Sequence, residues 1–327
     1  MSGIVGHMTY AILASEEAAR RDLSVAALIR RHYASYLAGA YLGCDIQTLP
    51  ASVCEDTGEE VGYGAGHLDR SPITGGATRR WTLQLSGRSY APQTICDMFY
   101  GRSHLTFGWT EDDTRHALPW DALPGYFAAV LADVHDLFDS DARQLAYVVG
   151  WITHVIGDAL IKGVRPDINL HLLDGRYTPR NRPIQDLISF HEVGREELGL
   201  DWSRLMDDLV NTPVEPIQLH YMRVSEPRGR LAELHDGAWE PDDKPLLRQT
   251  LMANRRYQRV RSGRLLRELA LTETSSGREC GEEMSKTAGG LRYGEMLELA
   301  AAADFRGAVS SIADAIADMF EQVEEYR

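Results

Sequence analysis

The sequence predicts an all-α fold: a large multi-helix bundle with long irregular loops and at most one small β-hairpin. One observation behind this prediction is that apolar residues recur at helical spacing along most of the chain. Another is that strand-like alternation is confined to the short segment RWTLQLSGR at 80–88. With 327 residues, the chain can also bury a large core. We expect a helical metal-binding catalytic domain at 1–225 with a helical extension at 226–327 packed on it, or a single domain over 1–327.

Each helix is predicted from an apolar stripe and from the glycine or proline that ends it. Gly43 and Pro50 mark the end of the second helix, and Pro183 suits a first helical position. The stretch 58–76 holds six glycines and no helical period, which predicts a long loop that could cover a site. The helices are expected at 7–21, 23–42, 92–100, 123–138, 143 to just before Gly163, 183–198, 202–210, 213–222, 244–271 and 291–326.

Composition narrows the class of protein. A net charge of -14 and a pI near 5.2 argue against sequence-independent binding to nucleic acid or to anionic lipid. The four cysteines form no CxxC pair, which suits a reducing compartment. The N-terminal segment lacks the basic region of a signal peptide, and the expectation is that no apolar run is long enough to span a bilayer. The expectation is a cytoplasmic protein with no transmembrane segment and no nucleic-acid partner.

The helix that begins at Arg143 is apolar on nearly every face, which is typical of a helix buried inside a domain. It contains His154 and Asp158, four residues apart, so both side chains project from one face. A buried carboxylate is costly unless positive charge meets it, and no lysine or arginine lies on that face within a turn or two. The sequence therefore predicts a positively charged partner for Asp158 from elsewhere.

Three interpretations of this pair are open. It could be a structural pair completed by a distant arginine, a catalytic dyad, or part of a metal site. A dyad leaves the charge poorly compensated, whereas an imidazole and a carboxylate at this spacing can share one cation. A metal site is therefore the working hypothesis.

Other histidines and aspartates supply further candidate ligands. His7 lies at the start of the first helix and Asp45 follows the second, while either His104 or His67 could supply a ligand from a loop. A ligand set of imidazoles and carboxylates without thiolates suits zinc, and also iron or manganese. The candidate metal ligands are His7, Asp45, His104 (or His67), His154, Asp158, His171 and His191.

These residues and their surroundings resemble the zinc-dependent phospholipase C and fungal single-strand-specific zinc nuclease superfamily, over roughly the first 175 residues. In that superfamily an early His, an Asp after the second long helix, a loop His and a His-x-x-x-Asp helix supply the metals. Asn169-Leu170-His171 is also similar to the Asn-Leu-His of the nuclease branch. The matching residues are His7 in GHMTYA, Asp45 in LGCDIQ, His104 in RSHLTFG, and His154 with Asp158 in GWITHVIGDAL.

The resemblance implies an all-helical hydrolase of a small-molecule or lipid-like phosphate ester, with one to three zinc ions. It implies that Asp158 is a bridging or primary ligand, that Asp45 is a ligand or general base, and that both are catalytic. The chain departs from the superfamily in three places. It begins MSGIVG, where the superfamily uses the free amine of the mature first residue, and IKGVRPDIN offers no His after the His-x-x-x-Asp helix. The carboxylate expected four residues after the later His falls at Gly175 or Arg195, with Asp174 and Glu196 one position away.

Two other classes remain as alternatives. A type I terpene synthase is suggested by DDLVNTPVE at 207–215, although Asn211 replaces a hydroxyl residue and Pro213 would break the helix. A non-catalytic helical protein that retains a degenerate metal site is the other. His135-Asp136 and His235-Asp236 each give an HD dipeptide without a convincing upstream His or downstream Asp, and no Glu-x-x-His motif occurs to support a di-iron bundle.

The segment 248–267 is rich in arginine although the chain as a whole is acidic. The favoured interpretation is a solvated helix face paired with acidic neighbours; the alternative is a docking strip for phosphate or an acidic partner. Its seven arginines are Arg248, Arg255, Arg256, Arg259, Arg261, Arg264 and Arg267.

Overall fold

The computed structural model describes residues 4–42, 49–62, 67–71, 74–95, 120–137, 140–161, 168, 170, 172–173, 178, 180–212 and 243–326. It divides the chain into two compact units, each assembled from separate segments. The predicted domain boundary near residue 225 lies outside the described residues. The first unit consists of Met1–Gly43, Leu118–Thr212 and Ser262–Arg327, and the second of Cys44–Ala117 and Pro213–Arg261.

The all-α class predicted from the sequence is confirmed, because helices make up most of the described residues. A short 3₁₀ turn, η2 (Trp120–Ala122), precedes α5. The α-helices of the first unit are α1 (Ile4–Arg20), α2 (Ser24–Arg31), α3 (Tyr33–Leu42), α5 (Leu123–Leu137), α6 (Ala142–Ile161), α7 (Asn181–Ile188), α8 (Trp202–Val210), α12 (Glu282–Thr287), α13 (Tyr293–Ala302) and α14 (Phe305–Glu325).

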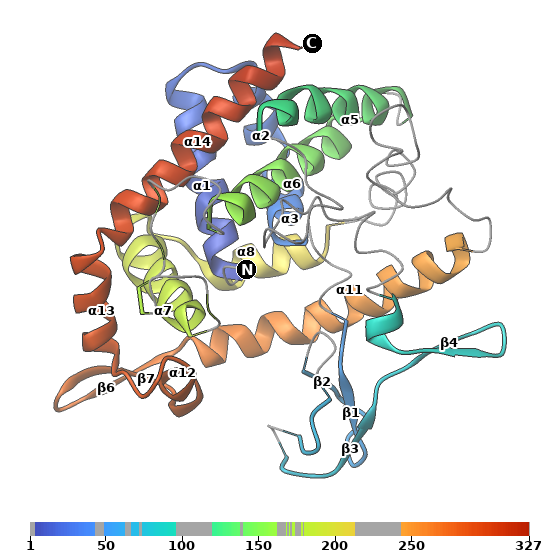
Figure 1. The fold of residues 1–327 in the computed structure, drawn as a ribbon, viewed down its shortest axis with the longest axis vertical. Helices are drawn as coiled ribbons and strands as arrows, with labels where there is room; N and C mark the ends of the chain where they lie inside the picture. Colours follow the sequence, from blue (N-terminus) through green and yellow to red (C-terminus); the bar gives the residue numbers. More distant parts are fainter. Residues whose placement is uncertain are drawn as a thin grey trace. The chain divides into compact units, whose positions relative to one another are not determined.

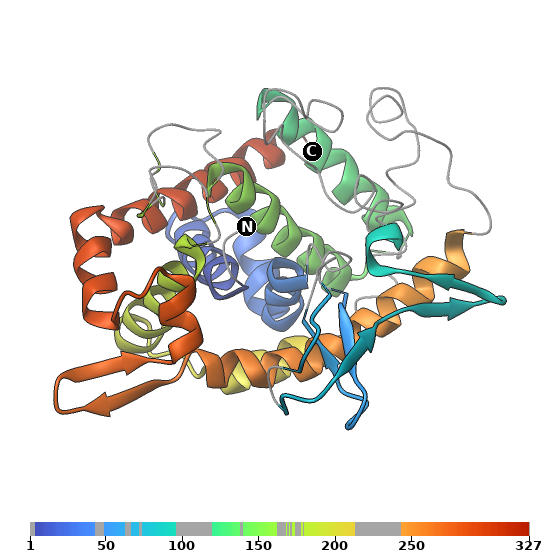
Figure 2. The ribbon, with the colours of Figure 1, turned by 60° about the horizontal axis from the view of Figure 1, so that its bottom comes forward.

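Helix α6 forms the core of the first unit, with α1, α3, α5 and α14 packed around it (Figure 1, Figure 2). Every residue from Ala146 to Ile161 is buried, as its nearly uniform apolar sequence predicts. By length and composition α6 is also a candidate membrane span, contrary to the expectation that no run would qualify, but 94% of its most apolar window is buried inside the protein. Burial of this extent is what the core helix of a globular unit shows.

Helices α3 and α6 cross at two glycines. A Cβ atom at Gly39 would lie 2.0 Å from the backbone oxygen of Tyr147, and one at Gly150 would lie 1.8 Å from the backbone oxygen of Tyr36. No side chain fits at either position, so the two backbones touch directly. This contact fixes the position of α6 along its own axis relative to the C-terminal half of α3.

Some predicted helices are divided by breaks. The predicted helix at 23–42 is divided into α2 and α3 at His32, and that at 291–326 into α13 and α14 at Asp304. Asp304 has a left-handed φ of 48°, and its carboxylate accepts a hydrogen bond from the N–H of Gly307. The apolar spacing continues through this break, because both helices bury a face in the same unit.

Helix α7 continues directly into a π-helical segment, η3 (Ser189–Glu197). The sequence predicted one regular helix over 183–198. Gly194 lies against the ring of Trp202, where a Cβ atom would come within 2.4 Å of Cζ2. Trp202 also stacks on Phe190, with ring centroids 5.2 Å apart, so a large ring is packed against this segment.

The strands are more numerous than expected. The sequence predicted at most one small hairpin, and the hairpin β4–β5 does cover 83–90, with Ser86 and Gly87 at positive φ in its two-residue turn. The other strands have only two to four residues, too few for alternation to be visible in the sequence. The strands are β1 (Ser52–Cys54), β2 (Glu60–Val61) and β3 (Thr78–Arg80) in one antiparallel sheet of order β2-β1-β3, and the hairpins β4 (Leu83–Leu85) with β5 (Arg88–Tyr90) and β6 (Leu271–Thr274) with β7 (Gly277–Cys280).

Helix α11 (Asp243–Glu268) carries the arginine-rich segment. Four of the arginines are exposed and three are half-buried. Arg256 forms an ion pair with Glu60 of β2, which also accepts a hydrogen bond from Nε1 of Trp81. The exposed arginines are Arg248, Arg256, Arg259 and Arg267, and the half-buried ones are Arg255, Arg261 and Arg264.

Candidate metal centre

Three of the predicted ligands lie together inside the first unit. His7 comes from the first turns of α1, and His154 and Asp158 come from α6. Nε2 of His7 lies 3.2 Å from Oδ1 of Asp158, and the two imidazole rings are stacked with their centroids 3.9 Å apart. One ligand atom from each residue lies within 4.8 Å of the others, and the residues are only 4%, 4% and 2% exposed.

Gly157 allows α6 to approach α1 at this point. A Cβ atom there would lie 3.1 Å from Cδ2 of Tyr10 and 3.4 Å from Nδ1 of His7. At the shorter of these two distances, the ring of Tyr10 would have to move away from the added Cβ atom. The missing side chain therefore lets the ring of His7 lie against α6, beside Asp158.

The protonation of His154 follows from its hydrogen bond to α3. Nδ1 of His154 lies 2.9 Å from the backbone oxygen of Ala40. Ala40 is in the last turn of α3, where carbonyl groups have no partner within the helix. A carbonyl oxygen only accepts, so Nδ1 carries the proton and Nε2 of the neutral ring carries the lone pair. Metal-binding histidines are commonly oriented in this way, through a carbonyl that fixes the tautomer.

The donor set fits a zinc ion. Two ligands at about 2.1 Å from a tetrahedral zinc lie roughly 3.4 Å apart. The 3.2 Å between Nε2 of His7 and Oδ1 of Asp158 agrees with that spacing. The ligand atoms of the three residues lie at most 4.8 Å apart, so the most distant pair could have to move closer by up to the difference when a metal binds. Two neutral imidazoles with one carboxylate are also the ligand types that zinc, iron and manganese bind. A cation here would compensate the buried charge of Asp158.

None of the remaining predicted ligands that the structure describes is found in this group of three. Asp45, His104 and His171 lie outside the described residues. His191 lies apart from the group, on η3, where Nε2 donates to the backbone oxygen of Leu269 at 2.7 Å. Among the described residues, only His7, His154 and Asp158 form a group close enough to share a metal, and His191 is not part of it.

His67, the alternative loop ligand, belongs to the second unit. Its Nδ1 lies 2.9 Å from Oγ of Ser52, and its Nε2 lies 3.6 Å from a carboxylate oxygen of Asp69. The order serine, histidine, aspartate is that of a hydrolytic triad. However, Ser52 is fully buried and its Oγ accepts a hydrogen bond from the N–H of Leu68. The arrangement therefore holds the loop on β1 and offers no accessible nucleophile.

One carboxylate near the group was missed from the sequence. Asp186 of α7 is 4% exposed, and its Oδ1 accepts a hydrogen bond from the N–H of Gly6, 3.4 Å away, next to His7. Negative charge at a helix N-terminus is favourable, and here it holds the first turn of α1. Its spacing from Phe190, four residues on, could have placed it on the inward face of the predicted helix.

His191 should make the stability of the protein depend on pH. Burial and the nearby Arg195 and Arg278 lower its pKa from the ordinary 6.5, against the raising effects of the Leu269 hydrogen bond and of Glu192. Below that ordinary value the unfolded chain binds a proton that the folded protein resists, so stability is complete above about pH 6.5 and falls as the pH drops through the lowered pKa. Urea unfolding from pH 7.5 to 5.0 should therefore show a steeper loss for the wild type than for His191→Gln.

The exposed His135 provides a control for this measurement. Its replacement by Gln should leave the slope of stability against pH unchanged. Equal slopes for the wild type and His191→Gln would contradict the role given to His191.

Comparisons with known proteins add no relative. No protein-family model matches this chain. No curated protein and no solved structure matches it either. The resemblance to the zinc-dependent phospholipase C and zinc nuclease superfamily therefore stays a prediction, carried by the motifs around His7, His154 and Asp158.

Proposed function

We propose that the protein is a metal-dependent hydrolase of a phosphate ester, with a zinc ion held by His7, His154 and Asp158. The observation that carries the proposal is the meeting of these three buried side chains, with the ring of His154 oriented by the hydrogen bond between its Nδ1 and the backbone oxygen of Ala40. Imidazole and carboxylate ligands on a helical scaffold are also what the resemblance implies.

The geometry supports a metal site better than the other two interpretations of His154 and Asp158. A structural pair needs one cation beside Asp158, and His7 alone could supply it. That interpretation gives no reason for a second imidazole stacked on the first and oriented through a helix-end carbonyl. In a catalytic dyad without a metal, the carboxylate of Asp158 would have to react while it is only 2% exposed and out of contact with water.

When bound, a divalent cation would supply a Lewis acid that lowers the pKa of a water molecule and neutralises charge on a phosphoryl group. The residues of the chain have positioning roles in this proposal. Ala40 fixes the ring of His154, Gly157 admits the ring of His7, and Asp158 contributes the negative charge that favours a cation. Asp45 remains the predicted ligand or general base.

The proposal is tested by counting metal in the purified protein and measuring hydrolysis of bis(p-nitrophenyl) phosphate. The wild type should hold at least one equivalent of zinc, and His154→Ala and Asp158→Ala should lose it together with at least about a hundredfold in rate. His135→Ala removes an exposed histidine outside the group and should change neither quantity. Metal content and hydrolysis that survive in both site variants would overturn the proposal.

A second candidate is a structural metal site in a protein that is not an enzyme. The burial of all three side chains favours it, because a catalytic metal needs a position open to substrate. A wild-type protein that binds zinc tightly and turns over no phosphodiester would select this candidate. The terpene synthase alternative gains no support, because Asp207 and Asp208 are exposed on α8, which ends at Val210 before the motif is complete.

A further inference from the structure

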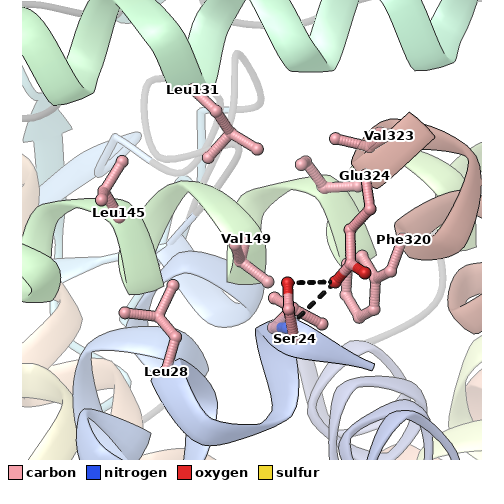
Figure 3. A pocket seen from close by; sticks show the side chains of 10 residues that line it. Ser24, Leu28, Leu131, Leu145, Val149, Phe320, Val323 and Glu324 are labelled. Carbon is pink, nitrogen blue, oxygen red and sulfur yellow. Dashed lines mark hydrogen bonds between the residues drawn. The ribbon is translucent and has the colours of Figure 1, made fainter. Parts of the chain in front are cut away.

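A cavity of about 110 Å³ lies within the first unit, between α2, α5, α6 and α14. Most of its lining is aliphatic or aromatic, and the labelled side chains point into it from all four helices (Figure 3). An apolar cavity of about 150 Å³ is large enough to bind benzene. The space here suits a thinner group, such as an alkyl chain of roughly four to six carbons. The lining residues are Ser24, Val25, Leu28, Leu131, Leu145, Val149, Ile152, Phe320, Val323 and Glu324.

One end of the cavity is polar and negatively charged. Oε1 of Glu324 accepts hydrogen bonds from Oγ of Ser24 at 2.7 Å and from the N–H of Val25 at 3.0 Å (Figure 3). These bonds hold the carboxylate in place at the first turn of α2. No bond to Oε2 is present among the described residues, so this oxygen can accept a hydrogen bond from a ligand.

The charge around this end favours a cation. None of the described residues that line the cavity is a lysine, an arginine or a histidine. Glu324 lies in the last turn of α14, where the helix dipole is negative, and Asp318 and Glu321 precede it on the same helix. Its carboxylate also meets the first turn of α2, where the dipole is positive, so that end of α2 offsets part of the negative charge. Arg21 is the cation that the structure describes beside those two residues, and it is also paired with Glu17.

The cavity is separate from the candidate metal centre. Leu145, Val149 and Ile152 share one face of α6 by their spacing. Asp158 follows Val149 by nine residues, which at about 100° per residue places it on the opposite side of the helix. The inference below therefore does not depend on the proposed function.

We propose that this cavity binds a short alkylammonium ion, with its alkyl chain among the apolar side chains and its ammonium group on Oε2 of Glu324. Transfer of the alkyl chain of the ligand from water to the apolar cavity is favourable. The ammonium group at the end of the cavity donates a charge-assisted hydrogen bond to the carboxylate of Glu324. A fatty acid of the same length would place a second carboxylate beside Glu324 and is excluded by repulsion.

Binding of n-pentylamine to the full-length protein, measured by calorimetry and by two-dimensional NMR, tests the proposal. Pentan-1-ol and pentanoate are probes of matched length without positive charge. We expect the amine to bind at least about tenfold more tightly than the alcohol, and pentanoate not to bind. Glu324→Gln keeps an oxygen for Ser24 and Val25 but removes the charge, and should weaken amine binding about tenfold. Glu325→Gln changes the same charge at an exposed neighbour and should leave binding unchanged.

Filling the cavity supplies a second, independent measurement. Val149→Phe should abolish amine binding, and Leu145→Phe, at a half-buried position, serves if the first variant does not fold. Equal affinity for the alcohol and the amine would overturn the proposal by showing an apolar cavity without charge selection. A protein that binds no probe, and whose melting temperature rises when the cavity is filled, would show that the space is a packing gap.

Discussion

Replacing Gly150 by alanine should destabilise the protein by at least about 3 kcal/mol. The new Cβ atom would lie 1.8 Å from the backbone oxygen of Tyr36 and 3.1 Å from the backbone nitrogen of Ala40. Backbone atoms cannot rotate away as a side chain can, so α3 and α6 would have to separate along their contact. Chemical denaturation followed by circular dichroism measures the loss. Because Ala40 also holds His154, the same change should weaken metal binding if the proposed site is present.

Gly263 of α11 is the matched control for this substitution. It is exposed and helical, and the nearest atom to an added Cβ is the end of the Arg267 side chain, 3.8 Å away. Gly263→Ala should therefore be neutral or stabilising by up to about 1 kcal/mol, since alanine favours a helix. Gly150→Ala with the stability of the wild type would contradict the direct contact between α3 and α6.

Replacing Asp158 by asparagine should have opposite consequences with and without metal. In chelator, stability should stay within about 1 kcal/mol of the wild type, because asparagine keeps an oxygen for His7 and removes a buried charge. With zinc at a thousand times its dissociation constant, the wild type should gain about 4 kcal/mol, or roughly 5–10 °C in melting temperature. The variant should lose most of that gain, because the ligand that carries the charge is missing.

Thermal unfolding of both proteins, in zinc and in chelator, gives the four values needed. If zinc raised the melting temperature of Asp158→Asn as much as that of the wild type, any bound metal would lie elsewhere. If Asp158→Asn were strongly destabilised in chelator, the carboxylate would have a structural role in the metal-free protein.

Much of the helical fold follows from the sequence because helix formation here depends on local apolar spacing. The core helix α6 was expected from Arg143 onward, and α1, α5 and α8 were expected close to their observed limits. The sequence predicted no break near Asp304, because the apolar stripe continues past it. No strand was predicted for the hairpin β6–β7, because strands of four residues show too little alternation.

The candidate site divides in the same way. That His154 and Asp158 share one face is determined by their spacing on a single helix, and the apolar sequence around them determines that this face is buried. Only the tertiary structure decided which distant residues reach them. It brought His7 to Asp158 and the Ala40 carbonyl to His154, and it left His191 bonded to Leu269. These choices depend on how closely α1 and α3 approach α6, and that approach is set where glycines let backbone and rings touch, at Gly39, Gly150 and Gly157. A periodicity shows which face of a helix is buried, but it does not contain the distance to the neighbouring helix.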